Sequence, residues 1–412
     1  MYDYIMVRYG DLTLKGRNQK KFRETLNKQL KRKCSYLNVK FEFQHDMIYI
    51  KLNDVDADEV ISILDTVSGL SSYSKVVKTF YDLKTIASLS ANLITEVSKG
   101  KKVTFKVETK RADKRVSLTS LEITKEVSGM ILSNLNNLIV DVHNPELTLF
   151  IEVRHDATYL YVNRIPGMGG FPVSIAGKGL VLLSGGIDSP VSAYLAMKKG
   201  LEVDCIHFES TPLTSVESAQ KVIDITEKLS KYAPDLKINL HMIPFKDIHE
   251  QIIINTPEPY VITIMRRMMY RIASMVAKIN DCKVLISGDS IGQVASQTIE
   301  SMVTIQNVTD TLIIRPLAAF DKSEIIKIAK KIDTFTISNR PFSDCCTVYV
   351  PKNPVIRPDI EKAEKYEKIY DYKPLIDKVI NEVITIQIDA RKHLDIQSKG
   401  LTVKEAFDNL NK

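Results

Sequence analysis

A short turn rich in glycine and serine, placed directly after an apolar run, constrains the fold of this chain more than any other feature. Residues 180–183 are Leu-Val-Leu-Leu, and Ser184-Gly185-Gly186-Ile187-Asp188-Ser189-Pro190 follow them. An apolar run that ends at glycines predicts a buried strand, and Pro190 predicts the start of a helix. Turns at the carboxyl ends of buried parallel strands bind anionic ligands. The sequence therefore predicts an α/β domain with an anion-binding turn at residues 184–189.

The alternation of strands and helices continues through the rest of this region. Further apolar segments and helical patterns follow in turn at residues 203–208, 215–231, 238–243, 260–279, 283–287 and 323–331. Apolar strands joined by helices of this length form parallel sheets that helices cover on both faces. We expect residues 179–412 to form this domain and residues 166–178, which are rich in Gly and Pro, to be the linker before it.

Two smaller α+β units are predicted before the linker. Residues 1–80 have the order β-α-β-β-α-β of a ferredoxin-like domain. The helix at 19–33 has apolar residues at helical spacing, which leaves these basic residues for its outer face: Lys20, Lys21, Lys28, Lys31 and Arg32. Residues 81–165 repeat a mixed pattern of two helices and several strands, so we expect a second small α+β domain there.

Basic residues concentrate in these first two units. Residues 1–40 hold seven Lys and four Arg against three Asp or Glu, whereas the whole chain has a net charge of only +7. A loop predicted at 108–115 adds four cations: Lys110, Arg111, Lys114 and Arg115. A concentrated basic surface is typical of proteins that neutralise nucleic-acid phosphates. On charge alone, a solvated helix face explains the first cluster about equally well.

Composition excludes several classes of protein. The hydrophobic fraction is 44%, and no apolar run approaches the roughly 20 residues that span a bilayer. The amino-terminal residues do not have the pattern of a secretory signal, so we expect a cytoplasmic protein with no membrane partner. The five cysteines are scattered and form no C-x-x-C pair, which argues against a disulfide scaffold and a zinc site.

Residues 184–189 carry the groups that a phosphate-binding turn needs. The glycines let backbone N–H groups converge on phosphate oxygens, and the serines add hydroxyl donors at the amino end of a helix. Asp188 would repel a bare phosphate, so we expect Mg²⁺ to bridge the two, and we assign no residue as a dedicated metal ligand. An ordinary strand-to-helix turn can also be rich in Gly and Ser. The G-x-x-x-x-G-K-[ST] loop of kinases and GTPases is absent.

Several further motifs make the chain resemble one family of enzymes. Residues 184–190 are similar to the pyrophosphate loop (PP-loop) of the N-type ATP pyrophosphatases, and most of the chain resembles the tRNA 4-thiouridine synthetases, or tRNA sulfurtransferases. The motifs that carry the resemblance are at residues 7–16, 110–113, 184–190, 266–269, 287–289, 292–298, 315–317 and 344–347. The resemblance implies a parallel-sheet PP-loop catalytic domain, of the adenine nucleotide α-hydrolase-like fold, preceded by ferredoxin-like and THUMP RNA-binding domains.

The resemblance also implies which residues bind ATP and RNA. The implied ATP positions are Leu182, Leu183, Ser184, Gly185, Gly186, Asp188, Ser189, His207, Phe208, Arg266, Gly288 and Gln297. The implied RNA positions are Arg8, Lys15, Arg17, Lys110, Arg111, Lys114 and Arg115. The resemblance also implies that Asp188 and Lys322 are catalytic. Lys322 matches the family lysine that stabilises charge on the departing pyrophosphate or adenylate.

Cys345 and Cys346 indicate thiol chemistry. They lie in a predicted loop between Pro341 and Pro351, after the last predicted strand of the sheet. The resemblance implies that ATP adenylates uridine 8 of a tRNA and that a protein persulfide then replaces its O4 with sulfur, with release of AMP and pyrophosphate. Family members with a single cysteine here align it with Cys346, so we assign Cys346 as the persulfide carrier and Cys345 as a resolving thiol. The residues alone do not separate the two thiols.

The absence of a later cysteine shapes the expected partners. No cysteine follows Cys346, and the chain resembles short family members without a C-terminal rhodanese domain. We therefore expect a pyridoxal-phosphate cysteine desulfurase to load Cys346 directly. A tRNA is the other expected partner, and separate domains for RNA binding and catalysis are compatible with a homodimer.

Two alternatives remain open from the sequence. Another adenylating PP-loop enzyme, such as a tRNA lysidine synthetase, would share the turn but gives no reason for the cysteine pair. A catalytically inactive RNA-binding module would share the basic clusters, but the presence of Asp188 and Lys322 argues against it.

Overall fold

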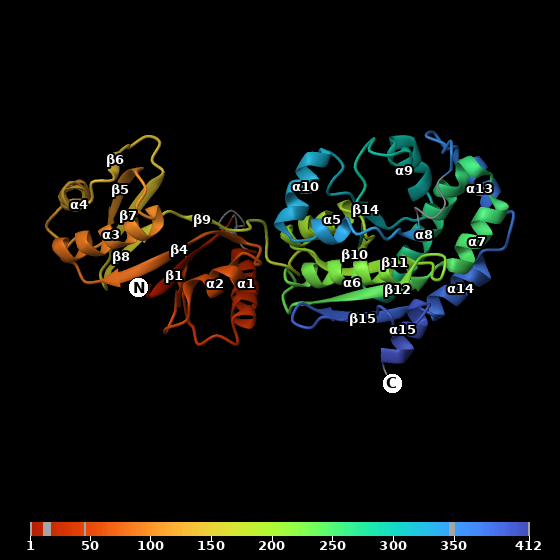
Figure 1. Cartoon of the computed structure of the whole chain (residues 1–412), viewed down its shortest axis with the longest axis horizontal. Helices are drawn as coiled ribbons and strands as arrows, with labels where there is room; N and C mark the ends of the chain where they lie inside the picture. The colour runs from red at the N-terminus through yellow and green to blue at the C-terminus, as the bar shows by residue number, and fades with distance from the viewer. Residues whose placement is uncertain (1, 11–17, 45–46, 346–350, 411–412) are drawn as a thin grey trace. The chain divides into compact units, whose positions relative to one another are not determined.

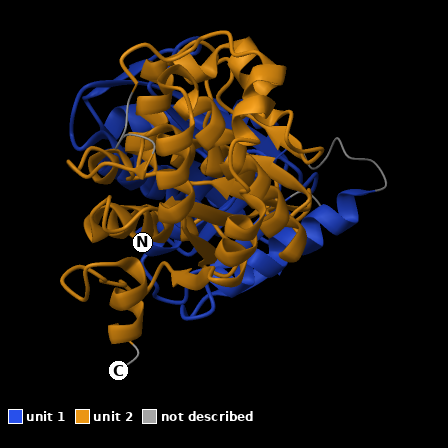
Figure 2. Ribbon diagram, turned by 90° about the vertical axis from the view of Figure 1, so that its right-hand side faces the viewer, with its two compact units in different colours: residues 1–171 blue, residues 172–412 orange. Residues whose placement is uncertain are grey.

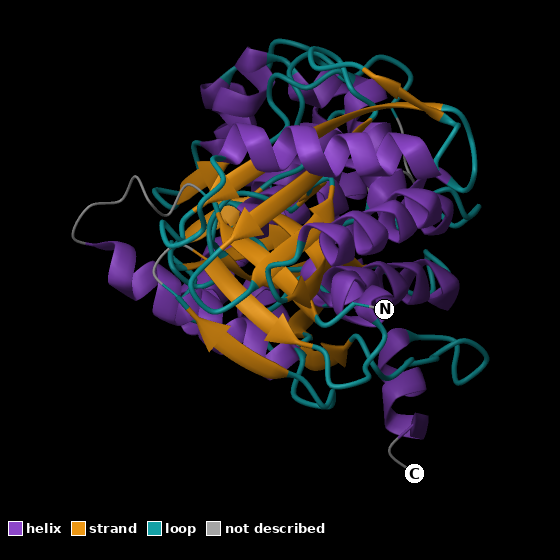
Figure 3. Cartoon of the chain, turned by 90° about the vertical axis from the view of Figure 1, so that its left-hand side faces the viewer, coloured by secondary structure: helices purple, strands orange, loops and turns teal. Residues whose placement is uncertain are grey.

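The protein is described here by a computed structural model that covers residues 2–10, 18–44, 47–345 and 351–410 (Figure 1). The chain divides into two compact units, residues 1–171 and residues 172–412 (Figure 2). Each unit combines helices with a sheet (Figure 3). Three of the predicted site residues lie outside the described residues: Lys15, Arg17 and Cys346.

The first unit begins with the ferredoxin-like order that the sequence predicts. Its elements are β1 (Tyr4–Tyr9), α1 (Gln19–Lys33), β2 (Lys40–Phe43), β3 (Met47–Lys51), α2 (Ala57–Leu64) and β4 (Leu70–Thr79). β1 pairs antiparallel with β3 and β4, which gives the spatial order β2-β3-β1-β4. α1 buries Leu26 and Leu30 in the core, and the five basic residues predicted for its outer face are exposed, as the helical spacing requires.

The rest of the first unit extends the same sheet. Its elements are α3 (Leu83–Ser98), β5 (Val103–Arg111), α4 (Ser120–Asn134), β6 (Leu138–Val140), β7 (Leu147–Val153), β8 (Thr158–Val162) and β9 (Ile165–Pro166). β8 pairs with β4, so in the described residues one sheet runs β2-β3-β1-β4-β8-β7-β5-β6. β9 also pairs with β4, and the N–H groups of Gly167 and Gly169 donate to the carbonyls of Ser71 and Leu70 at 2.8 Å each. The first residues of the segment that we expect to be a linker are therefore held to β4.

The second unit is a mainly parallel sheet. Its strands are β10 (Lys178–Leu182), β11 (Glu202–Glu209), β12 (Lys237–Pro244), β13 (Val284–Ile286), β14 (Leu312–Ile314) and β15 (Ile384–Asp389). They lie in the order β14-β13-β10-β11-β12-β15, and all neighbouring pairs except β12 and β15 are parallel. The strand order reverses at β10, which has β11 on one side and β13 on the other. The predicted parallel sheet is thus present.

Helices cover this sheet on both faces. The helices are α5 (Asp188–Lys198), α6 (Val216–Ser230), α7 (Lys246–Asn255), α8 (Val261–Ile279), α9 (Ile299–Gln306), α10 (Lys322–Lys331), α11 (Phe335–Ser338), α13 (Ile360–Glu367), α14 (Lys373–Asn381) and α15 (Val403–Leu410), with short 3₁₀ turns at Glu258–Tyr260 and Ala295–Gln297. Because parallel crossovers are right-handed, α5 and α6 cover one face, and α8, which leads back to β13, covers the other. Among the described residues no helix is long and apolar enough to cross a bilayer.

Helix α5 begins at Asp188, so Pro190 lies in its first turn, where proline is accepted, and the predicted helix start near Pro190 is confirmed. One local prediction for the second unit is wrong. The predicted last strand is not the last, since β15 follows the cysteine pair and joins the edge of the sheet beside β12 (Figure 1). The sequence prediction missed β15, although its alternating apolar and polar residues are typical of a half-buried strand. Asp188 and Ser189 therefore belong to the first turn of α5.

His249 is a titratable group in the core of the second unit. It lies on α7 with no exposed surface, and among the described residues neither ring nitrogen has a hydrogen-bond partner. Burial lowers the pKa of this imidazole, and nearby Glu250 offsets only part of that effect. The folded chain therefore holds His249 neutral, whereas the unfolded chain protonates it near the ordinary value of about 6.5.

We predict that His249→Leu makes the protein less sensitive to acid. A pKa that folding lowers stabilises the folded state above the ordinary histidine pKa, and this contribution is lost as pH falls below it. Between about pH 7.5 and about pH 5.5, the wild type should lose roughly 1 kcal/mol more free energy of unfolding than the variant. Urea unfolding at the two pH values measures the difference.

His393 provides a control of opposite sign. It is mostly exposed and hydrogen-bonds Glu227 at 2.8 Å, and this bond raises the pKa of His393. Its contribution to stability is therefore present at low pH and lost as pH rises, so His393→Gln should not reduce the acid sensitivity. Equal pH dependence in the wild type and His249→Leu would contradict the prediction.

Candidate functional site

The loops that follow β10 and β13 leave the same edge of the sheet, at the point where the strand order reverses. Val181 pairs with Ile286, so residues 183–187 and 287–289 begin side by side. Open α/β sheets bind their ligands at this switch point, outside the carboxyl ends of the strands. The fold thus places the predicted anion turn where a ligand is expected.

A cavity of about 500 Å³ lies at this edge. All of the predicted ATP positions except Gly185 line it, although they come from five separate segments of the chain. Asp289, Asp344 and Cys345 line it as well. The structure therefore brings the predicted nucleotide residues and one thiol of the cysteine pair together in a single cavity.

The turn of residues 184–187 is held by a small set of hydrogen bonds. The Ser189 hydroxyl accepts from the N–H of Ser184 at 2.9 Å, and the Ser184 hydroxyl accepts from the N–H of Gly186 at 3.3 Å. The N–H of Gly185 donates instead to Asp344 Oδ2 at 2.8 Å. The backbone donors of the turn thus point toward acceptors on the cavity side, and one of these acceptors is an anion.

His207 fixes the strand end beside the turn. The residue is 3% exposed, and its Nδ1 lies 3.0 Å from the carbonyl oxygen of Leu183. This bond joins the end of β11 to the residue that precedes the turn. The imidazole therefore has a structural partner in addition to its place in the cavity wall.

Two of the predicted catalytic residues, Asp188 and Lys322, form an ion pair. Lys322 Nζ lies 2.6 Å from Asp188 Oδ1, and Gln293 Nε2 donates to Asp188 Oδ2 at 2.8 Å. Asp188 is the first residue of α5 and Lys322 is the first residue of α10. Two helix amino ends therefore bring one anion and one cation together; Asp188 lines the cavity, and Lys322 does not. The sequence assigned no role to Gln293, although it lies inside one of the matching motifs.

Arg266 is oriented by a buried carboxylate. Its Nη2 lies 2.6 Å from Asp289 Oδ1, and its Nη1 donates to the carbonyl of Ser296 at 3.0 Å. Arg315 approaches the other oxygen of Asp289 at 3.4 Å. Burial by itself raises the pKa of Asp289, but the positive charge of Arg266 and the surrounding hydrogen bonds lower it overall. An ionised Asp289 thus sets the direction in which Arg266 faces the cavity, a role that the sequence did not indicate.

Cys345 is the described thiol at this cavity. It is 4% exposed and lines the same wall as Asp344. Three other thiols are also buried, and burial raises the pKa of Cys34 and of Cys282 to about 12 and raises that of Cys205 as well. High pKa values make those three poor nucleophiles. Cys346, the predicted carrier, lies outside the described residues.

The predicted basic loop at 108–115 is partly wrong. β5 continues to Arg111, because its backbone pairs with β7 as far as Val153. Arg111 Nη1 donates to the carbonyls of Val116 and Leu118 at 2.8 and 3.2 Å, so its charge supports the loop. Lys110 is exposed on the strand.

The other described cations that we predicted to bind RNA differ in the contacts that their side chains make. Lys114 is exposed in the loop, whereas Arg115 pairs with Asp113 at 2.7 Å, and this hydrogen bond lowers the pKa of Asp113. Arg8 lies over the ring of Tyr161, 5.0 Å from its centroid. Of the described cations predicted for RNA, Lys110, Lys114 and Arg115 are exposed, and the three arginines also make contacts within the fold.

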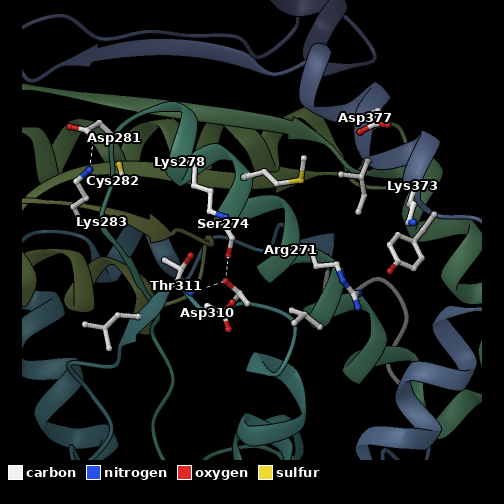
Figure 4. Close-up of a pocket in the computed structure, with 16 residues that line it drawn as sticks. Arg271, Ser274, Lys278, Asp281, Cys282, Lys283, Asp310, Thr311, Lys373 and Asp377 are labelled. Atoms are coloured by element: carbon white, nitrogen blue, oxygen red, sulfur yellow. Dashed lines mark hydrogen bonds and ion pairs between the residues drawn. The ribbon is translucent and has the colours of Figure 1, made fainter.

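A second cavity lies at the opposite end of β13 and β14. It measures about 940 Å³, and Lys283 and Leu312, at the amino ends of these strands, line it (Figure 4). Its charges are mixed, and Lys283 already pairs with Asp281 at 2.5 Å. None of the predicted site residues lines it. We assign the function to the smaller cavity, because ligands of parallel sheets bind at the carboxyl ends of the strands.

Comparison with known proteins identifies the family. A family model described as thiamine biosynthesis protein (ThiI) matches residues 174–372, one for the ThiI ferredoxin-like domain matches residues 4–74, and one for the THUMP domain matches residues 80–163. A relative named "Probable tRNA sulfurtransferase" from Acholeplasma laidlawii is 48% identical over 405 residues, which cover 98% of each chain. This chain belongs to the ThiI family of tRNA sulfurtransferases.

Solved structures agree with this ThiI assignment. A 4-thiouridine synthetase crystallised with RNA and bound ATP matches with a TM-score of 0.85 and 32% identity, over 94% of this chain and 100% of that one. A protein of Pyrococcus horikoshii matches with a TM-score of 0.60 and 22% identity, over 80% of this chain and 99% of that one, and shows the fold alone. The expected fold, a PP-loop domain preceded by ferredoxin-like and THUMP domains, is confirmed.

Gly288 allows the two loops of this ThiI-family site to meet. A Cβ at this position would lie 2.9 Å from the backbone nitrogen of Ser189 and 3.0 Å from its Cα. These are backbone atoms of the first turn of α5, so no side-chain rotation could relieve the contact. The glycine therefore sets how closely β13 approaches the turn.

We predict that Gly288→Ala weakens binding of Mg-ATP, the ligand that the family resemblance implies, by at least about tenfold, because α5 must shift away from β13. Isothermal titration with Mg-ATP measures the change. Gly129→Ala is the matched control, because a Cβ there meets nothing within 4 Å. That change should leave the affinity intact and stabilise α4 by about 1 kcal/mol. Unchanged affinity in Gly288→Ala would show that the loops do not need this close contact.

Proposed function

We propose that this chain is an ATP-dependent tRNA uridine 4-sulfurtransferase. It adenylates uridine 8 of tRNA, replaces O4 of that base with sulfur from a protein persulfide, and releases AMP and pyrophosphate. The observation that carries the proposal is the shared cavity of the PP-loop turn, the oriented Arg266 and the thiol of Cys345. Nucleotide cleavage alone would not need a cysteine in that wall.

The residues around the cavity favour one orientation of a bound ATP. Leu182 and Phe208 offer apolar surface for the adenosine, and the turn after β10 offers backbone donors for the phosphates. Arg266 adds a cation whose direction is fixed by Asp289. The adenosine would thus lie along the strand ends with its phosphates over the amino end of α5.

The donor set at Asp188 fits a magnesium ion carried by the substrate. Among the described residues no group of three or more His, Cys, Asp or Glu could hold a metal. Mg²⁺ commonly uses one or two protein carboxylates and completes its shell with phosphate oxygens and water. Asp188 can supply one carboxylate at the end of the turn. When bound, the ion would neutralise charge on the phosphates.

Adenylation needs stabilisation of the leaving pyrophosphate. Uridine O4 would attack the α-phosphorus of ATP, the bond to the bridging oxygen would break, and pyrophosphate would leave with the electron pair. Lys322 Nζ lies 2.6 Å from Asp188, so this cation would lie near phosphates that bind over the amino end of α5. A fixed cation at the developing charge lowers the barrier to this step.

Sulfur transfer then uses the cysteine pair. The terminal sulfur of a Cys346 persulfide would attack C4 of the base, and AMP would leave with the oxygen. A second thiolate, from Cys345 or an external thiol, would attack the inner sulfur, form a disulfide and release 4-thiouridine. Two electrons from an external reductant would then reduce this disulfide and restore the two thiols. A pyridoxal-phosphate cysteine desulfurase is the proposed source of the persulfide sulfur.

The first unit is the proposed tRNA-binding part. Exposed basic residues on α1, with Lys110 and Lys114, offer phosphate contacts. We propose domains at residues 1–80 and 81–165 for this part, a linker at 166–178 and the catalytic domain at 179–412. A homodimer is compatible with this division, and a cytoplasmic location, where tRNA is abundant, is part of the proposal.

One assay tests the function against its alternatives. The purified protein is incubated with unmodified tRNA, Mg-ATP and sulfide, and both pyrophosphate release and the near-ultraviolet absorbance of 4-thiouridine are followed. Both signals are expected. Pyrophosphate without the absorbance would indicate a different adenylating enzyme, and neither signal would indicate an RNA-binding module.

We predict that Asp188→Ala lowers pyrophosphate release by at least about a thousandfold, since it removes the phosphate-side carboxylate and the partner of Lys322. The affinity for tRNA, measured by filter binding, should stay within about twofold, because the variant leaves the basic surface intact. Asp333→Ala is a matched control, since Asp333 pairs with Lys228 at the surface. A large loss of tRNA affinity in Asp188→Ala would show that the turn has another role.

We predict that Cys345→Ser separates the first turnover from later ones. With cysteine, a cysteine desulfurase and an external thiol present, the first transfer of sulfur to tRNA should proceed at nearly the wild-type rate. Later turnovers should slow, because the external thiol must release each tRNA from Cys346 in place of Cys345. Rapid-quench measurement of 4-thiouridine per enzyme, with the quenched samples reduced, follows both phases. Cys282→Ser is the control and should change neither. Full multiple-turnover activity in Cys345→Ser would exclude the resolving role.

A further inference from the structure

Asp344 reaches the PP-loop turn from a segment far away in the sequence. Its Oδ2 accepts the N–H of Gly185 at 2.8 Å, and the residue that follows it is Cys345. The N–H groups of Ser184 and Gly186 donate instead to hydroxyls of α5 and of the turn itself. Among the described residues, the acceptor that a distant segment supplies to these three N–H groups is thus a carboxylate directly before the cysteine pair.

The residues before Asp344 are held against the same turn. The Ser338 hydroxyl donates to the carbonyl of Gly186 at 3.2 Å. Lys221, a buried lysine on α6, donates to the carbonyls of Arg340 and Phe342 at 3.2 Å each. Burial lowers the pKa of Lys221, and the negative charge of Asp344 offsets part of this. Residues 338–344 therefore follow the turn closely and place Asp344 at its end.

Gly185 makes this close packing possible. A Cβ at this position would lie 2.9 Å from Lys221 Cε and 3.0 Å from Asp344 Oδ1. Any larger residue would displace the lysine stem or the carboxylate. Because Gly185 has no side chain, the Asp344 carboxylate can lie close to the turn.

The Asp344 carboxylate and a polyphosphate compete for the same donor. The N–H of Gly185 is a strong donor to anions at the amino end of α5, and two anions a few ångströms apart repel each other. A phosphate bound to this N–H must therefore displace Asp344 or weaken its hydrogen bond. Because Cys345 follows in the chain, movement of Asp344 also moves the backbone of the cysteine.

We propose that Asp344 is a positioning residue that couples occupation of the PP-loop turn by a nucleotide polyphosphate to the exposure of Cys345. With Asp344 on Gly185, the thiol stays in the cavity wall, where it is 4% exposed. Displacement of Asp344 by the β- and γ-phosphates releases the residue that bears the thiol. Sulfur chemistry would thereby follow nucleotide binding rather than precede it. This inference rests on the proposed ATP function.

The test measures alkylation of Cys345 in the whole chain. A Cys346→Ser background leaves Cys345 as the thiol of the pair, and the high pKa values of Cys34, Cys205 and Cys282 keep those sites slow. Iodoacetamide reacts with the protein, and mass spectrometry of the Cys345 peptide gives the rate. The probe is the magnesium complex of α,β-methylene-ATP, whose α–β bridge resists cleavage, and calorimetry measures its affinity separately.

The expected result has two parts. In the Cys346→Ser background, a saturating concentration of the probe should raise the Cys345 alkylation rate at least about fivefold. Adding Asp344→Ala should give the fast rate without the probe and no further rise with it. That variant should also bind the probe about threefold to tenfold more tightly, because the competing carboxylate is gone.

Two further variants act as controls. Asp344→Asn keeps the size and an amide oxygen that can accept from Gly185 but removes the charge, so its affinity for the probe should also rise. Asp281→Asn removes one exposed carboxylate at the other end of β13 and should change neither the affinity nor the alkylation rate. The background protein with Asp344 intact tests the coupling by itself, even if Asp344→Ala fails to fold.

The outcomes separate this inference from the proposed function. If the protein with Asp344 intact does not bind the probe, the proposed function fails and this coupling fails with it. If it binds the probe and the alkylation rate of Cys345 does not rise, only the coupling is overturned. An alkylation response that persists in Asp344→Ala would show that Asp344 has a structural role alone.

Discussion

The parallel pairing of β10 with β13 is the constraint on which the rest of the site depends. Gly179 permits it, because a Cβ there would lie 2.8 Å from Ile286 Cδ1 and 2.9 Å from Val284 Cγ2. Gly288, which follows β13 in the chain, permits a second close contact, between the loop after β13 and the first turn of α5. With both glycines in place, the two loops at the switch point face one cavity. The predicted ATP-binding residues, which come from distant segments of the chain, then lie around this one cavity.

Buried charge sets the direction of the side chains around that cavity. Asp289 orients Arg266, and the pair lies too deep for water to screen it well. A similar arrangement joins α8 to α13, where Glu367 contacts Arg267 at 2.7 Å and Arg271 at 2.6 Å. Removing one partner of such a set leaves an uncompensated buried charge, so these groups give one preferred geometry. The basic residues of the first unit are different, since several are exposed and suit an extended, hydrated partner.

The accuracy of the prediction differs between local and long-range features. The ferredoxin-like order, the amphipathic helix at Gln19–Lys33 and the alternation of strands and helices all follow from periodicity, and the structure confirms them. β14 was missed because it has only three residues, whereas β15 was missed although its alternating apolar and polar residues are typical of a half-buried strand. The end of β5 was misplaced because charged residues in a paired strand look like a loop.

The sequence by itself determined the chemistry that this ThiI-family chain can offer. Glycines after a buried strand, an aspartate at the end of the turn and a vicinal cysteine pair indicate phosphate binding and thiol chemistry, because backbone freedom and side-chain reactivity are local properties. The resemblance to the family implies that this thiol chemistry is sulfur transfer. Only the tertiary structure decided which groups share a cavity and which are already paired. Lys221 and Asp344 are far apart in sequence from Gly185, and no local pattern reveals that they pack against it. The turn, the carboxylate and the thiol meet because strand register and burial bring distant segments together, and those are properties of the whole fold.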